Sequence, residues 1–102
     1  MTRRSQMEIL IDILEAVVEG RQKPTHILYK ANLSWTRLNK NLDLLVKQNL
    51  LRSIRIDEND RHETTVRGKE VLAYFRKVEG ELAQVTDRRV TRPAEVYIRH
   101  QQ

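Results

Sequence analysis

Hydrophobic residues recur at helical spacing in the first fifth of the chain. Between Ser5 and Gly20 they fall three or four positions apart, and acidic residues occupy the remaining face. Ser5, with a glutamate three residues later, fits a capping box, and Gly20 fits a helix stop. The pattern predicts an amphipathic first helix. A short second helix is expected to start at a Thr25 cap and to end at Asn32 in the left-handed conformation.

A third helix is predicted over residues 34–48. Ser34 is suited to capping it, and Leu38, Leu42 and Leu45 share one face. The opposite face is polar and basic. Two short helices joined by so tight a turn are typical of a helix-turn-helix, in which the second helix enters the DNA major groove.

The period changes to two from Leu50. Residues 51–56 alternate as a strand, residues 57–60 form an acidic turn, and residues 61–65 return as a second strand. This hairpin is a candidate wing. Thr65 is then expected to cap a fourth helix, and Pro93 prevents that helix from continuing undisturbed.

The fourth helix has an apolar stripe with the a/d spacing of a heptad repeat, which predicts self-association into a homodimer. The residues of this apolar stripe are Val71, Phe75, Val78, Leu82 and Val85. Three segments follow from the pattern: a winged helix-turn-helix domain over 5–67, a dimerisation helix over 68–92 and a basic tail over 93–102. The fold class is mainly α, with a small β-hairpin wing and an extended C-terminal helix.

Charge is concentrated where the helix-turn-helix is predicted. The chain of 102 residues has a formal net charge of +5 at pH 7. Residues 30–56 contain six basic side chains and a single acid, Asp43, so this stretch alone carries +5. The remaining basic and acidic residues cancel. A clustered positive charge predicts a polyanionic partner, and double-stranded DNA fits the elements around it.

Composition removes other classes of function. Cysteine is absent, so disulfides and thiolate metal sites are excluded. No apolar run approaches the roughly 18 residues of a membrane span. Acidic residues follow Arg3 and Arg4 too closely for a secretion signal, so we expect a cytoplasmic protein. No metal site, cofactor site or catalytic grouping is predicted, and the chain is not expected to be an enzyme.

The order of elements resembles the small archaeal winged helix-turn-helix DNA-binding proteins. The resemblance spans roughly residues 7–85. Its motifs are Lys23-Pro24-Thr25-His26-Ile27, Ala31-Asn32-Leu33-Ser34, the exit Asn49-Leu50-Leu51, and residues 65–68. It implies that the long C-terminal helix pairs with a second copy as an antiparallel coiled coil. One departure lies in the second wing strand, where family members usually have an aromatic residue and a leucine, and this chain has His62 and Thr64.

The predicted DNA contacts lie mostly on the third helix and the wing. They are Lys30, Trp35, Thr36, Arg37, Asn39, Lys40, Arg55, Arg61 and His62. Arg37 and Lys40 are expected on phosphates, which need only charge and reach. Asn39 has the groups to read adenine. Trp35 either stacks on a base or sugar or is partly buried. Arg3 and Arg4 are further candidates for phosphate contact.

The resulting hypothesis is a homodimeric DNA-binding transcriptional regulator. Two alternatives stay open at this point. An architectural protein would use the same residues on phosphates without sequence preference, and a protein-interaction module would use the winged helix as a scaffold. The sequence does not identify the DNA site, a small-molecule effector or the direction of regulation.

Overall fold

The computed structural model describes residues 4–91, with side chains described for residues 4–85. The predicted fold class is confirmed. Four helices and one antiparallel hairpin follow in the order α1 (Gln6–Val18), α2 (Pro24–Ala31), α3 (Trp35–Lys47), β1 (Leu51–Ile56), β2 (Asn59–Thr64) and α4 (Val66–Thr91). The chain divides into two compact units, 1–72 and 73–102, so the division falls within α4. The predicted tail over 93–102 lies outside the described residues.

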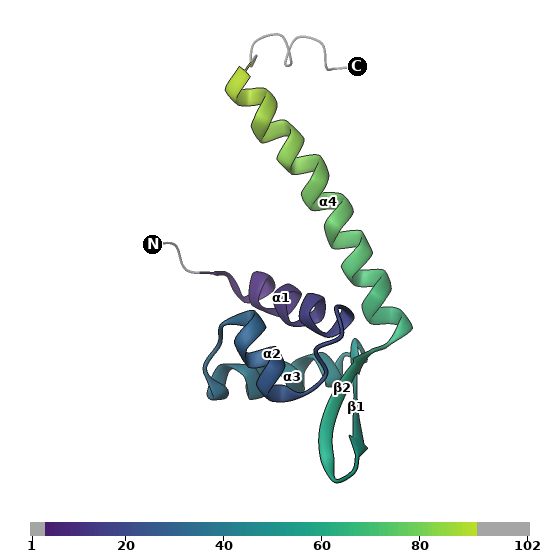
Figure 1. Cartoon of the computed structure of the whole chain (residues 1–102). Coiled ribbons are helices and arrows are strands. Elements are labelled where there is room, and N and C mark those ends of the chain that lie inside the picture. The colour runs from purple at the N-terminus through teal and green to yellow at the C-terminus, as the bar shows by residue number, and fades with distance from the viewer. Residues whose placement is uncertain (1–3, 92–102) are drawn as a thin grey trace. The chain divides into compact units, whose positions relative to one another are not determined.

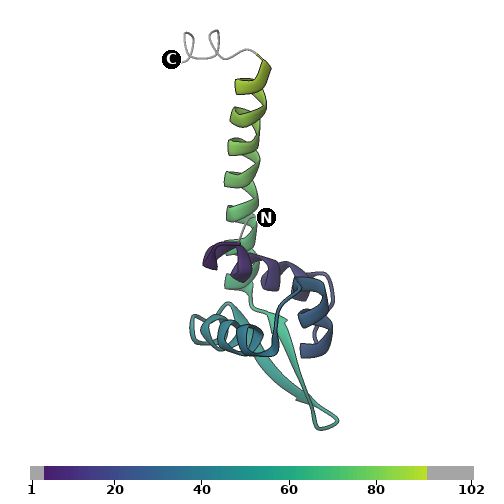
Figure 2. The ribbon, with the colours of Figure 1, turned by 90° about the vertical axis from the view of Figure 1, so that its left-hand side faces the viewer.

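Three helices and the hairpin make up the first unit (Figure 1). In the view turned by 90°, the hairpin again extends beyond the three helices (Figure 2). Each of α1 and α2 packs against α3 and β2 as well as against the other. The core between them is aliphatic. Its fully buried large side chains are Ile13, Leu14, Ile27, Leu38, Leu45, Leu51 and Leu72.

The predicted caps are confirmed at most helix ends. Ser5 and Glu8 form a reciprocal capping box at the start of α1. Asn32 ends α2 in the left-handed conformation, with φ of 57°. The Ser34 hydroxyl accepts a hydrogen bond from the Arg37 N–H at 3.3 Å. These local interactions set the angle at which the chain leaves α2 and enters α3.

The cap predicted for α2 is wrong. The helix begins at Pro24, and Lys23 occupies the capping position without a side-chain hydrogen bond. Proline is favoured at the first helical position because its fixed φ suits the helix and its missing N–H has no helical partner there. Thr25 therefore lies inside the helix.

The predicted register of the wing also needs correction. The strand β2 begins at Asn59, two residues earlier than predicted, and Ile56 pairs with Asn59 across the hairpin. Only Asp57 and Glu58 form the turn, with φ of 51° and 64°. Two positive φ values in succession match the twist of a tight hairpin, and here two acidic residues adopt them instead of the usual asparagine and glycine. The acidic segment is thus partly strand.

The start of α4 is fixed to the exit of α3 and to the hairpin. The Thr65 hydroxyl accepts a hydrogen bond from Gly68 N–H at 2.9 Å and donates one to the Asn49 carbonyl at 2.7 Å. The predicted Thr65 cap is therefore confirmed. A Cβ on Gly68 would lie 2.1 Å from the Leu50 carbonyl oxygen, so only glycine permits this approach.

Candidate nucleic-acid interface

The third helix has one buried face and one exposed face. Leu38, Leu42 and Leu45 are buried, as the leucine spacing predicts. The exposed face carries the residues predicted to contact DNA from this helix, namely Trp35, Thr36, Arg37, Asn39 and Lys40. The Trp35 side chain is 47% exposed, so both proposed roles for it, stacking and partial burial, are compatible with its position.

Asn41 joins the buried side of α3 to α1. Its carbonyl oxygen accepts a hydrogen bond from Gln6 Nε2, and its amide nitrogen donates to the Arg37 carbonyl, each at 2.7 Å. Asn41 is only 3% exposed. No sequence pattern predicts this role of Asn41, because a single asparagine between leucines gives no sign of a partner 35 positions away.

The basic residues of the 30–56 stretch separate into two groups in the structure. Lys30 pairs with Glu19 at 3.7 Å, Arg55 pairs with Asp60 at 3.2 Å, and Arg52 pairs with Glu63. Among residues 4–85, no acid lies within ion-pair distance of the other three. These are Arg37, Lys40 and Lys47, all exposed on α3. The uncompensated charge of the stretch therefore lies on one helix.

Arg4 has an internal role instead of the phosphate contact suggested for it. Its guanidinium pairs with Asp12 at 2.7 Å and donates hydrogen bonds to the carbonyls of Ala31 and Asn32 at 2.7 and 2.9 Å. A cation suits this place because the last carbonyls of a helix carry partial negative charge. Arg4 thus holds the turn between α2 and α3, and Arg3 lies outside the described residues.

The ring of His62, which the sequence predicts to contact DNA from the wing, lies largely inside the protein. His62 is 8% exposed, and its backbone N–H donates to the Gln22 carbonyl at 2.9 Å. Strand alternation places this ring on the inner face of β2, which packs against α1 and α2. Burial lowers the pKa of His62, and the nearby charges of Asp60 and Asp43 oppose this shift without cancelling it.

Arg61 and Thr64, near His62 in β2, also have buried polar side-chain atoms. The Nε of Arg61, the Nδ1 of His62 and the Oγ1 of Thr64 are buried and have no hydrogen-bond partner among the described residues. Arg61 is half-buried, whereas Arg55 is exposed. His62 and Thr64 share the inner face of β2, which thus carries polar atoms where the resemblance leads one to expect an aromatic residue and a leucine.

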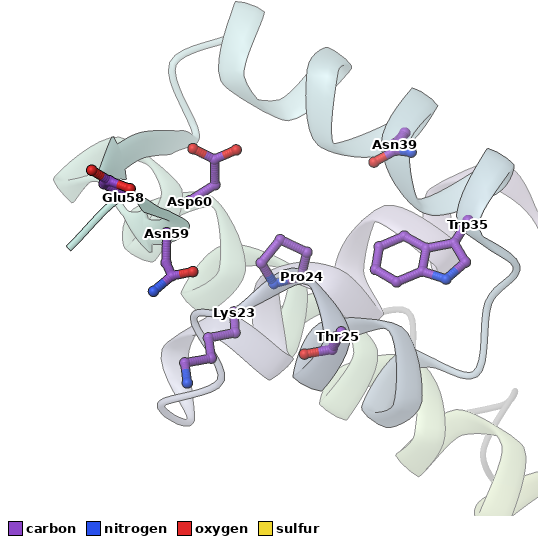
Figure 3. Close-up of a pocket in the computed structure, with 8 residues that line it drawn as sticks. All are labelled: Lys23, Pro24, Thr25, Trp35, Asn39, Glu58, Asn59 and Asp60. Carbon is purple, nitrogen blue, oxygen red and sulfur yellow. The ribbon is translucent and has the colours of Figure 1, made fainter. Parts of the chain in front are cut away.

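A hollow separates α3 from the hairpin turn. It is lined by Lys23, Pro24, Thr25, Trp35, Asn39, Glu58, Asn59 and Asp60. Figure 3 shows Trp35 and Asn39 on one side and the three hairpin residues on the other, with Pro24 between them. Residues 57–60, which we call the hairpin tip, therefore share a hollow with the exposed face of α3.

Much of the apolar stripe is exposed in the structure. Val78, Leu82 and Val85 are 52%, 60% and 56% exposed, while Val71 and Phe75 are half-buried. No cluster of three or more His, Asp or Glu side chains suited to a metal ion occurs within the described part of the chain. No helix in that part is both long and apolar enough to cross a membrane.

A known protein family and a known archaeal protein match this chain in sequence. The family model for winged helix-turn-helix proteins matches residues 3–83. The chain belongs to the winged helix-turn-helix family. The predicted relation to small archaeal members is confirmed by MJ0287 of Methanocaldococcus jannaschii, a protein described as uncharacterized. It is 33% identical over 71 residues, which cover 70% of this chain and 69% of MJ0287.

Two solved structures from Sulfolobus solfataricus share the winged-helix fold. Sso10a-2, described as a DNA-binding protein, is 27% identical with a TM-score of 0.65, over 83% of this chain and 92% of its own. The transcriptional regulator BldR is 21% identical with a TM-score of 0.71, over 87% of this chain and 66% of its own. The likeness to BldR shows the fold alone. The fold is thus one found in DNA-binding regulators.

Proposed function

We propose that this protein is a DNA-binding transcriptional regulator that places α3 in the major groove. The observation that carries the proposal is the group of exposed cations on α3, Arg37, Lys40 and Lys47, which have no acidic partner within the described residues. A cation without an internal partner loses no ion pair when it contacts a phosphate. The DNA-binding description of Sso10a-2, the more similar of the two solved structures in sequence, supports the same function.

Other exposed groups on the same face suit contacts to bases. Asn39 can donate to and accept from adenine in the major groove. Trp35 and Thr36 occupy the first turn of α3, the part of a recognition helix that usually approaches the bases. Arg55 and Arg61 of the hairpin, with Lys30 of α2, would meet the flanking backbone. For Lys30 and Arg55 that contact means exchanging an exposed ion pair for a phosphate.

Binding to random-sequence and genomic DNA pools over a salt series tests this function. Replacing Arg37 and Lys40 together with alanine should weaken binding and reduce the slope of log affinity against log salt by about two units. The matched control is Lys69→Ala with Lys77→Ala, which removes two exposed cations of α4. Unchanged affinity in a folded Arg37→Ala/Lys40→Ala variant contradicts the assignment.

The same experiment separates the regulator from its two alternatives. Enrichment of particular sequences supports a regulator. Uniform binding to all sequences indicates an architectural protein. No binding at low salt indicates a protein-interaction module, in which the basic face of α3 is dispensable.

We further propose that the protein acts as a homodimer joined through the apolar stripe of α4. Exposed valines at positions 78 and 85 recur on one face of this helix, and a second copy of the same stripe would cover them. A two-fold dimer holds two recognition helices at a fixed separation, which a two-fold DNA site can match. Two linked domains also bind a duplex more tightly than one.

Sedimentation equilibrium tests the dimer directly. Val78→Glu adds a charge within the stripe and should give monomers with weaker DNA binding. Gln84→Glu adds the same charge about 120° from Val78 on the helical wheel and should leave a dimer. A wild-type protein that is monomeric at tens of micromolar and still binds DNA fully would contradict the proposal.

A further inference from the structure

The hairpin tip is acidic, unlike the strands behind it that carry Arg55 and Arg61. It contains Asp57, Glu58 and Asp60, and all three are exposed. Asp60 pairs with Arg55 at 3.2 Å, whereas no cation lies within ion-pair distance of Asp57 or Glu58 among residues 4–85. The Asp57 and Glu58 carboxylates therefore carry uncompensated negative charge.

The position of these carboxylates relates them to the proposed DNA surface. Glu58 and Asp60 line the same hollow as Trp35 and Asn39 (Figure 3). A duplex that brings its bases to Trp35 and Asn39 therefore brings its phosphates near Glu58. The tight turn, with positive φ at Asp57 and Glu58, fixes the backbone that presents both side chains.

We propose that the acidic hairpin tip selects against DNA that is held only by its phosphates. The inference rests on the proposed function and makes it more specific. Like charges within a Debye length repel, so the tip lowers the affinity for every duplex by a similar factor. Contacts between α3 and base edges must then supply the stability of the complex, and only a preferred sequence provides them. At a given protein concentration the tip therefore leaves random duplex unbound while a preferred sequence stays bound, although the ratio of the two affinities is unchanged.

Charge variants at Glu58 test the proposal. Glu58→Gln keeps the size of the side chain, and Glu58→Lys reverses its charge, while both leave the Arg55–Asp60 pair in place. We expect Glu58→Gln to bind random duplex about twofold to fivefold more tightly at low salt, and Glu58→Lys about tenfold. The salt dependence of Glu58→Lys should steepen by about one unit. In both variants the affinity for the preferred site should rise by about the same factor, so that random duplex becomes occupied at protein concentrations at which the wild type leaves it free.

Glu70 offers a matched control. It is exposed on α4, which begins at the open end of the hairpin, whereas Glu58 lies in the turn at the other end. Glu70→Gln and Glu70→Lys make the same charge changes and should alter affinity much less. Equal gains at Glu58 and Glu70 would indicate a net-charge effect and overturn the assignment to the tip.

Two further results would also overturn the proposal. One is unchanged affinity for random duplex in both Glu58 variants. The other is weaker binding of Glu58→Gln to the preferred site, which would mean that the carboxylate accepts a hydrogen bond from a base. If either result occurs while the Arg37→Ala/Lys40→Ala variant still binds DNA more weakly than the wild type, the proposal for the hairpin tip fails and the proposed function stands. If the wild type binds no DNA, both fail.

Discussion

The helix α3, which we propose enters the major groove, and the hairpin distribute charge and buried polarity in opposite ways. In α3, Arg37 and Lys40 have no acidic partner among the described residues, while the buried Asn41 has two hydrogen bonds. In the hairpin, both Arg52 and Arg55 pair with acids across the strands, while the buried His62 leaves Nδ1 without a partner in the described part of the chain. Residues 30–56 place basic side chains in both regions, yet among the described residues of that stretch only those of α3 offer positive charge without an acidic partner.

The difference teaches that a charge count along a sequence is a poor guide to a binding surface. Cross-strand pairing brings an acid from β2 against each of the two arginines of β1. The exposed side chains of one helix can pair with each other only three or four positions apart. The one acid of the stretch, Asp43, lies outside ion-pair distance of Arg37, Lys40 and Lys47.

The largest effect is expected at the base of the hairpin. Gly68→Ala places a Cβ 2.1 Å from the Leu50 carbonyl oxygen and 2.7 Å from Thr64 Cγ2, so α4 must shift away from the hairpin. We expect a loss of about 3 kcal/mol in the free energy of unfolding, measured by denaturant melts.

Gly80 provides the control for that experiment, because no atom lies within 4 Å of its added Cβ. Gly80→Ala should leave stability unchanged or raise it by up to about 1 kcal/mol, since alanine is the better helix former. Similar losses in both variants would show that the loss in Gly68→Ala does not come from the close approach of Leu50.

The burial of His62 in the hairpin should make the free energy of unfolding depend on pH. Burial lowers the pKa of His62 in the folded protein, so the unfolded chain takes up a proton first as pH falls below about 6.5. Stability is therefore complete above this value and decreases as pH falls toward the folded pKa. The free energy of unfolding should therefore be lower at pH 5.5 than at pH 7.5.

His62→Phe should abolish this part of the pH dependence, because phenylalanine fills a similar volume and does not titrate. His26 is exposed, so His26→Gln should leave the dependence intact. Denaturant melts of the three proteins at both pH values measure the difference. A wild-type profile that His62→Phe does not flatten would refute the role of His62.

A smaller effect on the free energy of unfolding is expected when the N-terminal cap of α4 or of α3 is removed. Thr65→Ala removes a cap at 2.9 Å and a second hydrogen bond to the Asn49 carbonyl, and should cost about 1 kcal/mol or slightly more. Ser34→Ala removes a single, longer cap of 3.3 Å on α3 and should cost less, about 0.5 kcal/mol. Thermal melts measure both, and a larger loss for Ser34→Ala would reverse the expected order.

The last prediction concerns DNA and returns to the charge comparison. Arg52 of the hairpin is paired with Glu63, so Arg52→Ala should change DNA affinity by less than about threefold. Arg37→Ala, which removes an unpaired cation of α3, should weaken binding about tenfold and lower the salt slope by about one unit. If the two variants lose the same DNA affinity in a titration at fixed salt, the ion pairs of the hairpin do not keep its arginines from contacting DNA.

The order of the elements and most of their ends were predictable because their causes are local. Helical spacing identifies the buried face of α3, and the caps at Ser5, Ser34 and Thr65 depend on residues three positions away. Thr25 was assigned wrongly because a proline preceded it and two capping rules competed. The sequence predicts a wing turn that begins at the right residue but is two residues too long, because no glycine marks its end.

What the sequence alone determined is therefore the winged-helix order of elements and the helix that carries the basic face. The tertiary structure decided which cations remain without partners, that His62 is buried, and that the hairpin tip shares a hollow with Trp35 and Asn39. These facts depend on residues far apart in the chain, such as Arg4 with Ala31 or Arg52 with Glu63. Periodicity and capping act over a few residues, whereas pairing and burial are set only when distant segments meet.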